Sequence, residues 1–397
     1  MPRFLGPDVT EDVSDARVPT LDDFAPLHVW LEPDYDGGRI AGWVPDLPGA
    51  LAVAGSRDRV LSAALTAAGR VREWLEAHGD EAGIPRLRRS EVVGEVAARH
   101  EPDGYEVNAT LPTDRRSVSR EELAVATRRL GWAREDLLAL AGRIRAREGA
   151  GGPLPVDAGR GERTPDEVLR HVAGSEAWLV GRLPGGGRYE GPLDGSPTVE
   201  ALAGSRSWAL ERLDALVAGD HGAESSDRHG ETWTVAKVLR RLQAHGFDHL
   251  WELERRLSRA DGTRERIELR MDRRPDAGTM VGLLRSVGWD LRASEPASLQ
   301  HAITATPEFA AAWDGDRLVG TARSLTDGGQ NALIATVVVH PAYQGLGVGE
   351  RLVGLLTDGH DQVRFSLTAA PGMEGWYRKL GFVPDPDAMY RPRRQRA

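Results

Sequence analysis

The spacing of hydrophobic positions divides the chain into three parts. The first part has short runs of β-branched and alternating residues between Gly- and Pro-containing turns, a pattern typical of strands. The predicted strands are residues 28–31, 39–44, 51–54, 91–98 and 105–111. Residues 57–78 instead repeat hydrophobic positions with a helical period, and Gly79 ends that pattern. A small sheet with one long helix is expected here.

A helical period dominates the middle part of the chain. The predicted helices are residues 120–130, 135–147, 165–183, 198–217 and 234–257. The connecting segments 149–161 and 184–197 are rich in Gly and Pro, which favours antiparallel helices joined by loops.

Alternation returns in the third part, where strands and helices are mixed. The predicted strands are residues 266–271, 309–314, 318–324, 333–339 and 363–367, and the predicted helices are residues 277–287, 296–303, 347–357 and 372–380. We therefore predict a multidomain α+β chain with a disordered or extended tail (1–20), a small α/β module (21–112), an all-α helical bundle (113–262) and a mixed α/β domain (263–397).

Composition narrows the classes of function. The net charge of −9 argues against a general nucleic-acid surface, and the short basic tail that ends the chain does not reverse it. The chain has no cysteine, which excludes disulfides, thiolate nucleophiles and Cys-based zinc sites. No stretch approaches the ~20 apolar residues of a membrane span, and the first residues lack a signal-peptide core. We expect a cytoplasmic protein without a membrane partner.

Residues 337–350 contain the parts of a phosphate-binding turn. A β-branched strand ends at Pro341, and Gly345, Gly347 and Gly349 then allow a sharp turn before a helix. The N-terminus of such a helix favours an anion. No Lys follows these glycines as in a Walker loop, and their spacing differs from GxGxxG.

Two segments of the third part resemble the GNAT N-acetyltransferase superfamily. One is Gln344-x-x-Gly347-x-Gly349, preceded by VxVHP, and the other is WYRKLGF at 376–382. The resemblance covers residues 267–390 and implies acetyl-CoA as cofactor, bound where the strands 333–339 and 363–367 splay apart. It assigns cofactor binding to the residues Val337, Val339, Gln344, Gly345, Leu346, Gly347, Val348 and Gly349.

The same resemblance implies direct attack of an amine on the thioester. Tyr377 is the expected general acid for the leaving thiolate, and packing against the cofactor or the sheet is its alternative role. Many members of the family carry an acidic residue where this chain has Ala335 and Thr336. The base is therefore left open between water, His340 and none at all, if the amine arrives neutral.

Three histidines in the middle part form a candidate metal site. His245 and His249 share one helix face, and His171 lies in a second predicted helix. Neutral imidazoles from two facing helices suit a divalent metal, and Zn, Ni, Mn and Fe are not distinguished by this ligand type. These segments resemble DinB-like four-helix bundles, in which such a triad binds metal. The alternative is a bundle that only packs against its neighbours.

The turn around Pro45-Asp46-Leu47-Pro48-Gly49 resembles the HicB-type antitoxin module over residues 27–79. The resemblance implies an interaction or ligand-sensing module with a possible protein partner, and a purely structural role is the alternative.

These features predict an acetyl-CoA-dependent N-acetyltransferase that acts on a primary amine of a small molecule or peptide. One alternative is a DinB-like divalent-metal enzyme, for instance one that transfers groups to thiols, with accessory acetyl-CoA-binding and HicB-like domains. Another is a regulatory protein that binds acetyl-CoA without turnover.

Overall fold

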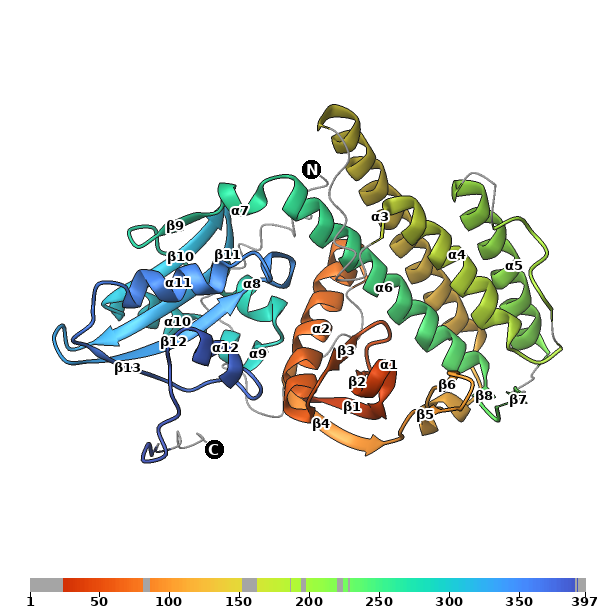
Figure 1. Ribbon diagram of the computed structural model, residues 1–397, viewed down its shortest axis with the longest axis horizontal. Helices are drawn as coiled ribbons and strands as arrows, with labels where there is room; N and C mark the ends of the chain where they lie inside the picture. Colours follow the sequence, from red (N-terminus) through yellow and green to blue (C-terminus); the bar gives the residue numbers. More distant parts are fainter. Residues whose placement is uncertain are drawn as a thin grey trace.

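The structure is a computed structural model. It describes residues 24–80, 86–151, 163–185, 187–193, 198–219, 224–227, 229–389 and 391. The expected tail at 1–20 and most of the predicted loop at 149–161 lie outside the described residues. Figure 1 shows a small N-terminal sheet, an array of long helices and a C-terminal sheet with its own helices.

The N-terminal sheet has the strand order β3-β2-β1-β4. Its strands are β1 (Ala25–Asp34), β2 (Arg39–Trp43), β3 (Leu51–Ala54) and β4 (Leu87–Glu95). A short α1 (Tyr35–Gly38) joins β1 to β2, which are antiparallel, whereas β1 and β4 are parallel. Helix α2 (Arg57–Ala77) covers one face of this sheet because its hydrophobic stripe, including Val60, Ala64 and Val71, is buried.

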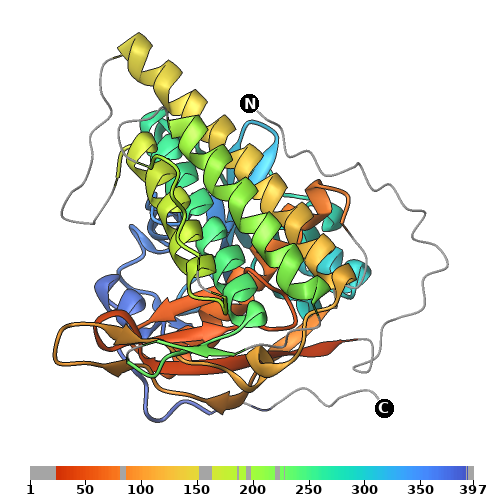
Figure 2. The same cartoon turned by 90° about the vertical axis from the view of Figure 1, so that its right-hand side faces the viewer.

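Among the described residues in the middle of the chain, four long helices lie alongside one another next to the N-terminal sheet (Figure 2). They are α3 (Arg120–Gly151), α4 (Pro165–Gly181), α5 (Thr198–Ala218) and α6 (Val235–Ala260). The predicted break between helices 120–130 and 135–147 was wrong, because α3 is continuous. Its buried positions Leu130, Ala133 and Leu137 keep the helical period across Gly131, so packing outweighs the weak helix propensity of that glycine.

The segment between the first sheet and α3 is mostly irregular. It contains the short antiparallel pair β5 (Arg99–His100) and β6 (Glu106–Val107), and the 3₁₀ turn η3 (Pro112–Arg115). A second short antiparallel pair, β7 (Ser225–Ser226) and β8 (Thr232–Trp233), lies between α5 and α6. The predicted strand at 105–111 was therefore wrong beyond β6. The reason is that the Ala109 amide donates to the Glu32 carboxylate at 2.6 Å, and the Leu111 amide to Asp114 at 2.8 Å.

The C-terminal part contains a five-stranded sheet with the order β13-β12-β11-β10-β9. Its elements are α7 (Thr263–Arg266), β9 (Glu268–Arg270), α8 (Ala277–Ser286), α9 (Asp290–Ala293), α10 (Pro296–Ala305), β10 (Glu308–Asp314), β11 (Arg317–Thr326), β12 (Asn331–Val339), η5 (Pro341–Tyr343), α11 (Val348–Thr357), β13 (Arg364–Leu367) and α12 (Glu374–Lys379). Helix α11 packs its Leu352 and Leu356 against one face of the sheet, and α8 packs Met280 and Leu283 against the other.

Helix α2 also docks on the C-terminal part (Figure 1). A Cβ atom on Gly69 would lie 2.7 Å from the Arg285 and Ser286 carbonyl oxygens, so only glycine allows this approach. One turn of α2 away, Arg72 forms a buried, bidentate ion pair with Asp290 and donates to the Arg285 carbonyl at 2.7 Å. Helix α2 thereby packs directly against the loop between α8 and α9. Within the residues that the structure describes, no helix is long and apolar enough to cross a membrane.

The docking of α2 can be tested by replacing Arg72 with Met, which leaves the Asp290 carboxylate buried without its cation. We expect the free energy of unfolding in urea to fall by about 3–5 kcal/mol. Arg57→Met in the same helix is the control, because Arg57 pairs with Glu95 at the exposed surface, and it should cost less than about 1 kcal/mol. Equal effects of the two substitutions would contradict this role of Arg72.

Candidate functional site

Strands β12 and β13 run parallel and then part. Their pairing covers Asn331 to Ile334 of β12 and ends at Leu367 of β13, whereas β12 continues to Val339. On its other side, β12 stays paired with β11 through Val338 and Val339. One edge of residues 335–339 therefore borders the space where the two strands diverge.

A bulge lies at the point of divergence. Thr336 has a φ of 52°, a left-handed conformation that is rare for a β-branched residue. Its carbonyl accepts from the Thr321 hydroxyl at 3.3 Å, and its hydroxyl accepts from Arg323 Nε at 3.0 Å. These contacts hold the bulge, and neither Ala335 nor Thr336 offers a carboxylate.

The glycine turn connects β12 to the N-terminus of α11. Gly345 and Gly347 have φ values of 78° and 76°, which residues other than glycine rarely adopt. Helix α11 begins directly afterwards, at Val348. The side chains of Leu346 and Val348 are buried in the core, whereas Gly345 is exposed. The backbone of this turn therefore faces solvent at the N-terminus of a ten-residue helix, where the helix dipole is positive. Such a position is suited to binding an anion.

Three further contacts order the residues around the turn. The Gln344 side chain donates to the Val339 carbonyl at 3.0 Å. A Cβ atom on Gly349 would lie 3.2 Å from the Trp376 ring and 3.6 Å from Val339, so α12 packs directly against the start of α11. The structure therefore brings together the two segments that carry the GNAT resemblance.

Tyr377 follows Trp376 on α12 and is half-buried. Its ring meets the rings of Trp376 and Phe382 at centroid distances of 4.8 and 5.8 Å. Burial raises the pKa of the Tyr377 phenol above its usual value, so the hydroxyl keeps its proton at neutral pH.

His340 is buried and bound to a residue that sequence reasoning missed. Its Nε2 lies 2.9 Å from the Glu73 carboxylate of α2, and its Nδ1 accepts from the Ala342 amide at 3.2 Å. Burial lowers the pKa of His340. Burial alone would raise the pKa of Glu73, but the neighbouring His340 and Arg317 outweigh it and lower that pKa to about 2. His340 thus links α2 to the end of β12, which leaves it poorly placed to take a proton from an acceptor.

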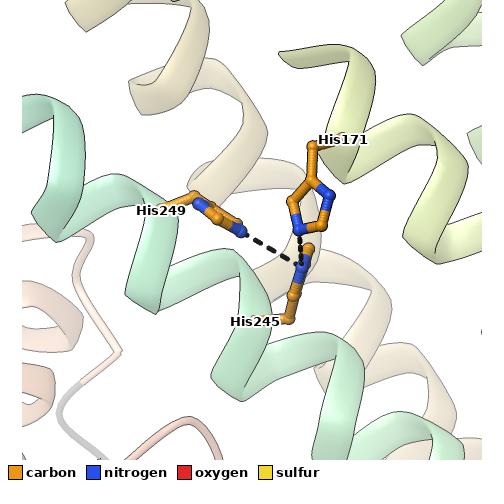
Figure 3. Close-up of side chains that lie close together, drawn as sticks. All are labelled: His171, His245 and His249. Carbon is orange, nitrogen blue, oxygen red and sulfur yellow. Dashed lines mark hydrogen bonds between the residues drawn. The ribbon is translucent and has the colours of Figure 1, made fainter. Parts of the chain in front are cut away.

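The three histidines of the middle part do meet (Figure 3). His245 Nε2 lies 3.0 Å from His171 Nε2 and 3.1 Å from His249 Nε2. Burial lowers the pKa of His171 to about 4 and that of His245 well below its usual value, which favours neutral rings. His249 Nδ1 meets the Glu252 carboxylate at 2.8 Å, a contact of the kind that orients metal-binding imidazoles.

This donor set fits a divalent metal. Nitrogen ligands about 2.0–2.1 Å from a tetrahedral zinc lie roughly 3.3 Å from one another, close to the 3.0 and 3.1 Å that separate His245 Nε2 from the Nε2 atoms of His171 and His249. His171, His245 and His249 would hold the ion, and Glu252 would fix the tautomer of His249.

Known proteins resemble the C-terminal part. The family model described as an acetyltransferase (GNAT) domain matches residues 306–384. An uncharacterized N-acetyltransferase, ycf52, of Porphyra purpurea is 38% identical over 112 residues, which cover 27% of this chain and 64% of that protein. The chloroplastic serotonin N-acetyltransferase 2 of Oryza sativa subsp. japonica is 39% identical over 131 residues, 30% of this chain and 65% of that protein.

The chain thus spans slightly less than two thirds of these relatives. Among solved structures, a GNAT family acetyltransferase of Streptococcus pneumoniae is 24% identical, with 32% of this chain and 98% of that chain covered and a TM-score of 0.29. The matched residues 306–384 include the diverging strands, the glycine turn and Tyr377. The C-terminal part of this chain is therefore a GNAT N-acetyltransferase domain.

Proposed function

We propose that the C-terminal domain transfers the acetyl group of acetyl-CoA to a primary amine of a small molecule or peptide. The observation that carries this proposal is the divergence of β12 from β13 directly before a glycine turn at a helix N-terminus, all within the family match. The three parts that we propose, 21–112, 113–262 and 263–397, place this chemistry in the last of them.

The cofactor would lie along the free edge of β12. Backbone groups of Val337 and Val339 would bind the pantetheine arm, and the amides of 344–349 would bind the pyrophosphate. The Gln344 side chain, which now donates to the Val339 carbonyl, would have to release that oxygen if the arm bonds to it.

The reaction needs one bond formed, one broken and two protons moved. The neutral amine attacks the thioester carbonyl carbon, the C–S bond then breaks, and the CoA thiolate takes the proton of Tyr377. The nitrogen loses its proton to water, because Thr336 and Ala335 provide no carboxylate and His340 is bound to Glu73. Placement of the reactants and proton donation by Tyr377 are therefore the two contributions that this site would supply.

The acceptor is proposed only as a primary amine. The name of the rice relative makes serotonin a sensible first probe, followed by polyamines and peptide N-termini. The HicB-like and DinB-like resemblances, a protein partner for the first module and a cytoplasmic location stay predictions.

A second candidate function is metal binding at His171, His245 and His249, favoured by their converging Nε2 atoms. A divalent ion there would supply a Lewis acid and an acidic bound water. The three side chains come from α4 and α6, well before residue 306, so this site is separate from the family match.

The cofactor assignment is tested by Gly347→Val. The new side chain would strain a residue with φ of 76° and fill the turn, so we expect the Kd for acetyl-CoA, measured by calorimetry, to rise at least roughly tenfold. Gly359→Val is the matched control, because Gly359 has a φ of 80° but lies beyond the far end of α11. An unchanged Kd for acetyl-CoA in Gly347→Val would contradict the assignment of the cofactor to this turn.

The acid role is tested by Tyr377→Phe. We expect kcat for CoA release to fall by about 10²–10⁴-fold with little change in acetyl-CoA affinity. Because the raised pKa keeps Tyr377 protonated, wild-type kcat should hold through neutral pH and decline only as pH rises through that value, above its usual 10. A variant with wild-type kcat would reduce Tyr377 to a packing role.

The metal assignment is tested by His245→Ala, which removes the central imidazole of the triad. After incubation with zinc and gel filtration, we expect about one metal ion per wild-type chain by elemental analysis and a large loss in the variant. His360→Ala, which changes an exposed histidine, is the control. Stoichiometric metal in His245→Ala would mean that the triad is not the site.

A further inference from the structure

The guanidinium of Arg264 lies beside the glycine turn. A Cβ atom on Gly347 would lie 3.8 Å from Arg264 Nη2 and 3.9 Å from its Cζ. Arg264 is exposed and belongs to α7, the short helix that joins α6 to β9. It precedes the family match at 306–384, so nothing in that match assigns it a role.

Helix α11 itself holds the Arg264 segment in place. Arg351, in the first turn of α11, donates to the Arg264 carbonyl at 3.1 Å and to the Ile267 carbonyl at 3.2 Å. Thr263 and Ile267 on either side are buried. The backbone of Arg264 is therefore fixed against the same helix whose N-terminus would face the cofactor.

The charge of Arg264 is not used within the protein. In the part of the chain that the structure describes, its guanidinium has no hydrogen bond or ion pair, whereas its neighbour Arg266 faces Asp314 at 3.7 Å. An acidic group, Glu350, also borders this position, with its Oε2 4.0 Å from the same Cβ position on Gly347. The Arg264 guanidinium lies slightly nearer to this position than that carboxylate does, so the charge of Arg264 stays available for an anion at the turn.

We propose that Arg264 binds a phosphate group of the 3′-phosphoadenosine diphosphate moiety of acetyl-CoA. The proposal rests on the proposed function, since it adds a ligand-binding residue to the same cofactor site. A guanidinium offers a planar pair of donors that matches a phosphate. Because this contact is remote from the thioester, it changes cofactor affinity and KM and leaves kcat unaltered.

The proposal ties the cofactor site to the middle of the chain. Arg264 follows α6 directly, and α6 carries His245 and His249 and packs against η5, just before the glycine turn. The cofactor's phosphates are therefore held from two sides, by the turn of the acetyltransferase domain and by the segment that enters that domain.

The test is binding of three ligands to the full chain: acetyl-CoA, its 3′-dephospho form and S-acetylpantetheine, which has no phosphate. We expect Arg264→Gln to weaken acetyl-CoA binding roughly tenfold and S-acetylpantetheine binding not at all. Arg264→Lys should recover part of the loss, and the exposed Arg120→Gln controls for net charge. A loss that persists with the dephospho form assigns the contact to the pyrophosphate, and a loss that vanishes assigns it to the 3′-phosphate.

Two results overturn the proposal. One is equal acetyl-CoA affinity in Arg264→Gln and wild type, and the other is an equal loss for acetyl-CoA and S-acetylpantetheine, which would show that the substitution only disturbs the fold. Failure of the wild-type chain to bind acetyl-CoA would instead remove the proposed function itself, and this proposal with it.

Discussion

The docking of helix α2 against the loop between α8 and α9 determines how the parts of this protein fit together. Gly69 allows the backbone of α2 to contact the backbone of this loop. Beside that contact, Arg72 and Asp290 form an ion pair in which both side chains are 3% exposed. Such a pair is costly to desolvate and specifies geometry more than it adds stability, provided that its hydrogen bonds are complete. Here both Asp290 oxygens accept from Arg72, and Asp290 also accepts from the Leu87 amide.

This docking places the N-terminal helix next to the acetyltransferase site. From α2, Glu73 reaches His340 at the end of β12, and Arg59 contacts Gly372, shortly before α12 and Tyr377. Helix α6 contacts the same domain through η5 and α7. Both preceding parts of the chain thus contact the GNAT domain.

Local patterns predicted most of the elements that matter for chemistry. Strand β12, the turn at 344–349, α12 and the spacing of His245 and His249 all follow from residue type and period within short windows. Contacts between distant residues were out of reach, because no periodicity links Arg72 to Asp290 or Glu73 to His340. Arg264 was missed for the same reason, since an arginine in a linker has no pattern until Arg351 fixes its position.

The central claim is that acetyl-CoA binds along β12 and across the start of α11. Hydrogen–deuterium exchange of the full chain, with and without acetyl-CoA, tests it most directly, because bound backbone amides exchange more slowly. The account predicts added protection confined mainly to residues 335–349 and α12. Unchanged exchange in 335–349 at saturating acetyl-CoA, or protection centred on the histidines of α4 and α6, would contradict it.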